Sequence, residues 1–116
     1  HRQREWLLDA LRRSDATWQV VVSSVPIAIP TGTVGRDGWA DYGQPSGFEH
    51  ELRAILRAAR QAGVRNLLWI TTDVHFGAAF RYQPFADDPE FEFHEVVTGP
   101  LNAGLFPRPQ VDESLR

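Results

Sequence analysis

Residues 66–77 read NLLWITTDVHFG, an apolar run that changes abruptly into polar and charged residues. The run Leu67–Ile70 follows a turn signal at Gly63 and is short and rich in strand-favouring residues, so it predicts a strand buried on both faces. Because side chains alternate along a strand, Asp73 and His75 are expected to point to the same side. The stretch therefore predicts a buried strand that carries a carboxylate and an imidazole at its carboxyl end.

The pair Asp73 and His75 has two interpretations. Carboxylates and imidazoles are common ligands of metal cations, and open α/β sheets bind their ligands beyond the carboxyl ends of the strands. Alternatively, the two residues form a structural pair that closes the strand end. A catalytic metal usually has about three protein ligands, so a metal site would need further donors from elsewhere. Spacing alone leaves both interpretations open.

The composition is that of an ordinary soluble globular chain. Its 116 residues have a hydrophobic fraction of 42% and a net charge of −3, which fits one domain and argues against nucleic-acid binding. Because the chain has no cysteine, any metal must be held by oxygen and imidazole ligands. No apolar run approaches the ~20 residues that cross a membrane.

The pattern of apolar residues predicts an α/β (α+β) chain of two helices and four strands. The first helix, at 3–13, is expected to bury Trp6, Leu7, Ala10 and Leu11, and the second, at 48–62, to bury Phe48, Leu52, Ile55, Leu56 and Ala59. The strands are expected at 17–25, 67–70, 78–82 and 91–97, with the first of them in the core. Ser46 and Glu49 predict a capping box for the second helix, and Gly63 predicts its left-handed exit.

Two segments lack a regular pattern. Residues 27–47 predict a long loop, and Trp39 and Tyr42 indicate that it is either packed on the surface or functional. Residues from Pro109 onward predict a frayed tail. A serine triad built from Ser23 or Ser24 with the Asp–His pair is disfavoured, because neither serine lies in a Gly-x-Ser-x-Gly motif.

Four blocks of the sequence resemble, in order, the PhoD-type alkaline phosphatases, a branch of the metallophosphoesterases. Residues 71–76, TTDVHF, are similar to the family's Gly-Asp-Val-His-Phe signature, with Thr72 in the position of the glycine. The other blocks lie at 3–20 (QREWL and SDATWQV), at 37–42 (DGWADY) and at 94–104 (HEVVTGPLNAG).

The resemblance implies a four-layer α/β/β/α sandwich, of which residues 1–116 would form the C-terminal portion. It implies metal-dependent hydrolysis of phosphate monoesters or diesters, with Asp73 and His75 as metal-binding catalytic residues. Trp39 and Tyr42 would line the substrate mouth. The implied metals are iron with calcium, other divalent metals being possible, and the remaining ligands would come from upstream segments.

The resemblance also implies two partners, a phosphate ester substrate and the rest of the protein's own catalytic domain. It implies export from the cytoplasm, although the residues themselves leave a cytoplasmic location open. The isolated chain is expected to be weakly active or inactive. The alternative is a non-catalytic α/β module for binding or assembly, in which Asp73 and His75 are structural.

Overall fold

A computed structural model of the chain describes residues 2–31, 38–40, 47–107 and 110–115. It contains α1 (Arg2–Arg13), β1 (Gln19–Ser23), α2 (Gly47–Gln61), β2 (Leu67–Thr71), β3 (Ala78–Tyr82) and β4 (Phe93–Val97). Each predicted helix and strand is present, with ends within two residues of those expected, so the α/β prediction is confirmed. Neither of these helices is long and apolar enough to cross a bilayer.

The four strands form one sheet in the order β1-β2-β4-β3. β2 pairs in parallel with both β1 and β4, whereas β3 runs antiparallel to β4. The register aligns Ser23, Thr71 and Val97 at the ends of the three parallel strands. The loops that leave β1, β2 and β4 therefore meet at the carboxyl ends of the parallel strands, which is the side of the sheet where ligands of α/β proteins bind. This side is called the carboxyl edge of the sheet below.

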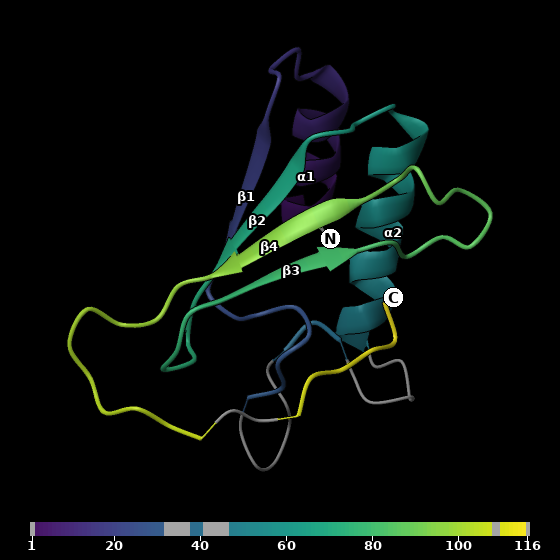
Figure 1. Ribbon diagram of the computed structural model, residues 1–116. Coiled ribbons are helices and arrows are strands. Elements are labelled where there is room, and N and C mark those ends of the chain that lie inside the picture. The colour runs from purple at the N-terminus through teal and green to yellow at the C-terminus, as the bar shows by residue number, and fades with distance from the viewer. Residues whose placement is uncertain (1, 32–37, 41–46, 108–109, 116) are drawn as a thin grey trace.

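Both helices lie on the same face of the sheet (Figure 1). The core between these layers includes Trp69 and Phe93 from the sheet and Leu52 and Leu56 from α2. The opposite face carries the cross-strand row Val22–Ile70–Val96–Ala79, and Val22 is 76% exposed. In the described residues, then, there are two of the four expected layers, a helical layer and a sheet with an uncovered apolar face.

The positions of β1 and β2 in the sheet differ from the prediction. β1 is an edge strand rather than a core strand, because the described sheet adds no strand beyond it. β2 is fully buried on the face that carries Leu67 and Trp69 but only half-buried on the other. Apolar runs look alike whether the second face is covered within the chain or left open, which is why the sequence predicted burial on both faces.

The buried side of α1 is rotated relative to the predicted one. Leu8 and Leu11 are buried, whereas Trp6 and Ala10 are exposed. Trp6 and Ala10 each lie two residues from Leu8, which is about 200° around a helix of 3.6 residues per turn. The helix therefore turns Trp6 and Ala10 away from the core when it packs through its leucines.

The buried stripe of α2 was predicted correctly except in its first turn. Leu52, Ile55, Leu56 and Ala59 are buried, but Phe48 is exposed and Glu49 is buried instead. The Glu49 carboxylate is compensated by an ion pair with Arg53 and by the Ser114 hydroxyl. Ser46 lies outside the described residues, so the predicted capping box stays a prediction.

The end of α2 follows the sequence signal at Gly63. Gly63 has a positive φ of 73°, a conformation that costs glycine little. Its N–H bonds to the Arg60 carbonyl, and the Val64 N–H bonds to the Ala59 carbonyl. These two bonds form a Schellman motif, which ends the helix and directs the chain into β2.

The tail was predicted to be frayed, and this prediction was wrong. The Asp112 N–H donates to the Ala28 carbonyl over 2.7 Å, and Arg53 donates to the Ser114 carbonyl. Leu115 is only 1% exposed, and the C-terminal end of the chain lies beside α2 (Figure 1). The proline-rich sequence of the tail did not indicate these contacts, because Ala28 and Arg53 are distant from the tail in the chain.

We expect Leu115→Ala to lower the free energy of unfolding by about 2–4 kcal/mol, since it removes a buried leucine side chain. Leu105→Ala is the matched control, because Leu105 is 84% exposed and its truncation should change stability by less than about 0.5 kcal/mol. Urea unfolding measures both variants. Equal stabilities would contradict the anchored tail.

The pH dependence of stability should report on Tyr82. Burial, and then the neighbouring Glu95 carboxylate, raise the pKa of Tyr82 above its usual range. Above about pH 10 the tyrosine of the unfolded chain ionises while the folded one keeps its proton. The free energy of unfolding should therefore fall as the pH rises, by up to about 1.4 kcal/mol per pH unit.

The chain has no lysine or cysteine, so its tyrosines are the only side chains that titrate between about pH 9 and 11.5. Urea unfolding across this range should show the slope in the unchanged chain. The slope should become smaller after Tyr82→Phe, and a slope that this substitution left unchanged would exclude Tyr82 as its source.

Candidate metal centre

The loop after β2 carries Asp73 and His75 to the sheet edge where the parallel strands end. β2 stops at Thr71, and residues 73–76 form a bend. The expected alternation of Asp73 and His75 required a continuing strand, but β2 ends before Asp73. The placement at the carboxyl end of β2 was nevertheless correct.

Asp73 has an unusual backbone conformation. Its φ is 79°, and it is the only non-glycine residue with positive φ in the described ranges. Such a conformation costs an L-residue up to about 1–2 kcal/mol, although aspartate tolerates it better than most, and strain of this kind often occurs at functional sites. The side chain is exposed, so its carboxylate oxygens are accessible to a cation.

His75 is oriented by the loop that follows β4. Its Nδ1 lies 2.5 Å from the Gly104 carbonyl oxygen, and its ring stacks on Phe106 with the centroids 4.4 Å apart. A carbonyl can only accept a hydrogen bond, so Nδ1 carries the proton and donates it. In the neutral ring the lone pair is then on Nε2. Metal-binding histidines usually have this arrangement, in which one ring nitrogen donates to a carbonyl or carboxylate and the other binds the metal.

Asp73 and His75 could supply at most two ligands to a metal ion. In the residues that the structure describes, no three His, Asp or Glu side chains are grouped so that they could hold a metal ion. A carboxylate oxygen suits hard cations such as calcium, and an imidazole nitrogen suits iron and other transition metals. A metal bound by Asp73 and His75 would therefore require donors beyond the described residues.

The two aromatic residues predicted at the substrate mouth have different outcomes. Tyr42 lies outside the described residues. Trp39 is half-buried, its indole N–H donates to the Ser23 hydroxyl over 2.9 Å, and its ring meets Trp69 edge to face at 5.7 Å. Since the only polar atom of its side chain bonds to Ser23, any contact of the Trp39 side chain with a substrate would involve the carbon atoms of the ring.

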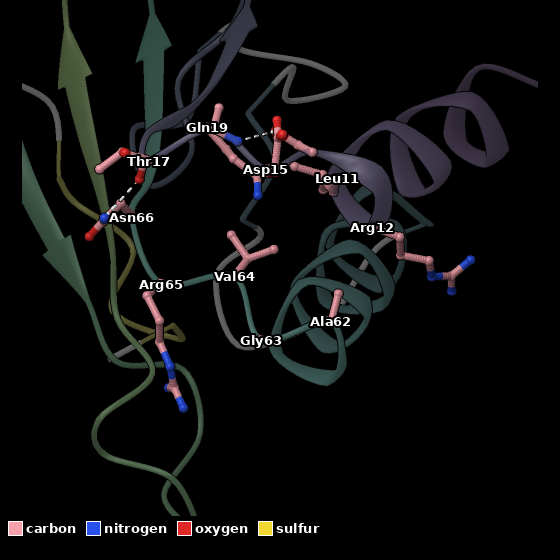
Figure 2. A pocket seen from close by; sticks show the side chains of 12 residues that line it. Leu11, Arg12, Asp15, Thr17, Gln19, Ala62, Gly63, Val64, Arg65 and Asn66 are labelled. Carbon is pink, nitrogen blue, oxygen red and sulfur yellow. Dashed lines mark hydrogen bonds between the residues drawn. The ribbon is translucent and has the colours of Figure 1, made fainter.

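A pocket of about 240 Å³ lies at the opposite end of the sheet. It is bordered by the ends of both helices and the starts of β1 and β2, with Gln19, Val64 and Asn66 in its wall. Figure 2 shows the side chains of Arg12 and Arg65 extending away from it. Asn66 donates to the Thr17 carbonyl, which connects the segments that precede β1 and β2. The pocket brings together no set of reactive groups.

Sequence reasoning from local patterns missed Gly104 and Phe106, which lie 29 and 31 residues from His75. No periodicity links positions so distant. The only available signal was the resemblance of the block at 94–104, which placed this segment near the signature without assigning it a contact.

Three comparisons with known proteins bear on the chain. The family model described as PhoD-like phosphatase matches residues 1–114. The solved structure described as "Structure of PhoD" matches with a TM-score of 0.63 and 20% sequence identity. That match covers 85% of this chain but 19% of the other chain. No curated protein matches.

Asp73→Gly should make the fold more stable while removing the carboxylate. Glycine relieves strain of about 1–2 kcal/mol and adds about 0.5–1 kcal/mol of unfolded-state entropy, which leaves a gain of up to about 1.5 kcal/mol. Thr72→Gly is the matched control, because Thr72 does not have positive φ and should lose about 0.5–1 kcal/mol. Urea unfolding of both variants tests this, and a destabilised Asp73→Gly would contradict it.

Proposed function

Because the chain belongs to the PhoD-like phosphatase family, we propose that the protein containing it hydrolyses phosphate esters and binds metal through Asp73 and His75. The observation that supports this most directly is the orientation of His75. Its Nδ1 contacts the Gly104 carbonyl, which leaves Nε2 available as a ligand. The exposed carboxylate of Asp73 lies on the same bend.

The substrates proposed are phosphate monoesters or diesters, and the metals proposed are iron with calcium. A metal ion held at this edge of the sheet would supply Lewis acidity toward the phosphoryl oxygens and activate water for attack. The residues of this chain contribute ligands and hold them in orientation. Trp39 and Tyr42 are proposed to contact the substrate beside the metal.

We also propose that the rest of the catalytic domain packs against the uncovered face of the sheet. Two observations support this. The row Val22–Ile70–Val96–Ala79 is apolar across all four strands, and apolar patches of this kind mark contact surfaces. Moreover, the match covers only 19% of the solved PhoD chain, so other segments of the full-length protein could supply the remaining metal ligands.

The metal content and phosphatase activity of the full-length protein test the proposal. Asp73→Ala and His75→Ala should each lower the amount of bound iron or calcium. Each should also reduce p-nitrophenyl phosphate turnover at least about 100-fold, which is more than the 10–100-fold loss typical of residues that contact a metal-binding side chain but not the metal. His50→Ala is the matched control, since His50 is exposed on α2, and it should leave both quantities unchanged.

Full metal content and turnover after both substitutions would remove the pair from the metal centre and favour the non-catalytic alternative. The 116-residue chain alone should bind metal weakly and show little or no turnover, because it supplies two ligands. Turnover by the isolated chain equal to that of the full-length protein would contradict the division of the site between segments.

A further inference from the structure

A fully buried carboxylate connects three segments next to the candidate site. Glu95, in the middle of β4, is 0% exposed. Its Oε1 accepts hydrogen bonds from the Ile27 N–H over 2.8 Å and from the Thr71 hydroxyl over 2.6 Å. Its Oε2 accepts one from the Tyr82 hydroxyl over 2.5 Å. A buried carboxylate without such partners would be strongly destabilising, so these donors must stay in place.

Thr71 is held on both its side chain and its backbone. It is the last residue of β2 and lies two positions before Asp73. While its hydroxyl donates to Glu95, its carbonyl accepts hydrogen bonds from the N–H and the hydroxyl of Thr98, over 2.8 and 3.0 Å. The point at which the chain leaves β2 is therefore fixed from two directions.

The far end of the bend is fixed as well, by a close backbone contact. Gly99 packs so tightly against Phe76 that a Cβ added to it would lie 3.2 Å from the Phe76 carbonyl carbon. Between Thr71 and Phe76, Asp73 adopts its strained conformation. Strain of this kind persists only when the surroundings hold the backbone firmly, and Thr71 and Gly99 provide that hold.

We infer that Glu95 is a positioning residue for the metal centre, acting through Thr71 to set the place of Asp73. The inference rests on the proposed function. Only Oε1 of Glu95 takes part, since it alone contacts Thr71. Oε2 is satisfied by Tyr82, which pairs with Phe93 at the end of β3 remote from the site. The two hydrogen bonds thus share one carboxylate but lead to opposite ends of the sheet.

This arrangement supplies a matched pair of substitutions for the full-length protein. Thr71→Val and Tyr82→Phe each remove one hydroxyl that donates to Glu95 and keep most of the side-chain shape. The probe is Co²⁺, titrated into the metal-free protein and followed by visible absorption, which depends on ligand geometry. Thr71→Val should weaken Co²⁺ binding about 10-fold or more, which is the effect expected for a residue that positions a metal ligand without contacting the metal. It should also change the absorption spectrum of the bound Co²⁺.

Turnover of p-nitrophenyl phosphate should follow the same division. Thr71→Val should lower kcat about 10-fold with little change in KM, whereas Tyr82→Phe should keep Co²⁺ affinity, spectrum and kcat within about twofold of the unchanged protein. Equal losses in the two variants would show that Glu95 acts only through general stability and would overturn the inference.

Two conservative variants separate position from charge. Thr71→Ser keeps the hydroxyl and should restore Co²⁺ affinity. Glu95→Gln keeps an oxygen that accepts from Thr71 and Ile27, so affinity should stay within about threefold despite the loss of charge. A large loss in Glu95→Gln together with normal binding in Thr71→Val would instead assign Glu95 an electrostatic effect and overturn positioning.

Thr71→Ala covers the case in which Thr71→Val fails to fold, because it removes the same hydroxyl donor to Glu95. It should also weaken Co²⁺ binding, and unchanged binding in this folded variant would overturn the inference. Asp73→Ala and His75→Ala distinguish its failure from that of the proposed function. If they bind Co²⁺ normally, the metal centre itself is wrong, whereas if they lose it and Thr71→Val does not, only the role of Glu95 is wrong.

Discussion

A carboxylate removed from water has to find hydrogen-bond donors inside the protein, and Glu95 finds them in three separate segments. This requirement does more than stabilise the core. It fixes Ile27 in the loop after β1, Thr71 at the end of β2 and Tyr82 at the end of β3 relative to β4. Because a buried charge tolerates little displacement of its partners, the loops at the carboxyl edge of the sheet start from well-defined positions.

Local sequence signals were sufficient for the elements whose partners are local. The end of α2 follows from Gly63, and β2 and β3 lie within one residue of the strands expected at 67–70 and 78–82. The errors arose where tertiary packing decides. A helical stripe of apolar residues does not say which 100° sector meets the core, so Trp6 and Phe48 were assigned to the interior although they are exposed.

The candidate site was predictable in its position but not in its geometry. A strand end followed by Asp73 and His75 indicated the right edge of the sheet, yet the backbone turns out of the strand at Thr71. The residues that orient His75 lie in another loop, and the ones that hold Thr71 are on β4 and just after it. Such contacts depend on which strands become neighbours, and β2 and β4 become neighbours only because the chain places β3 outside them.

The tail has a consequence for how the protein forms during its synthesis. Residues 110–115 complete the core by pairing with Ala28 and by inserting Leu115, yet they emerge from the ribosome more than eighty residues after Ala28 does. Contacts between such distant positions carry a large loop-closure entropy and form late. The part of the core around Ala28 and Leu115 therefore cannot close until residues 110–115 have been translated.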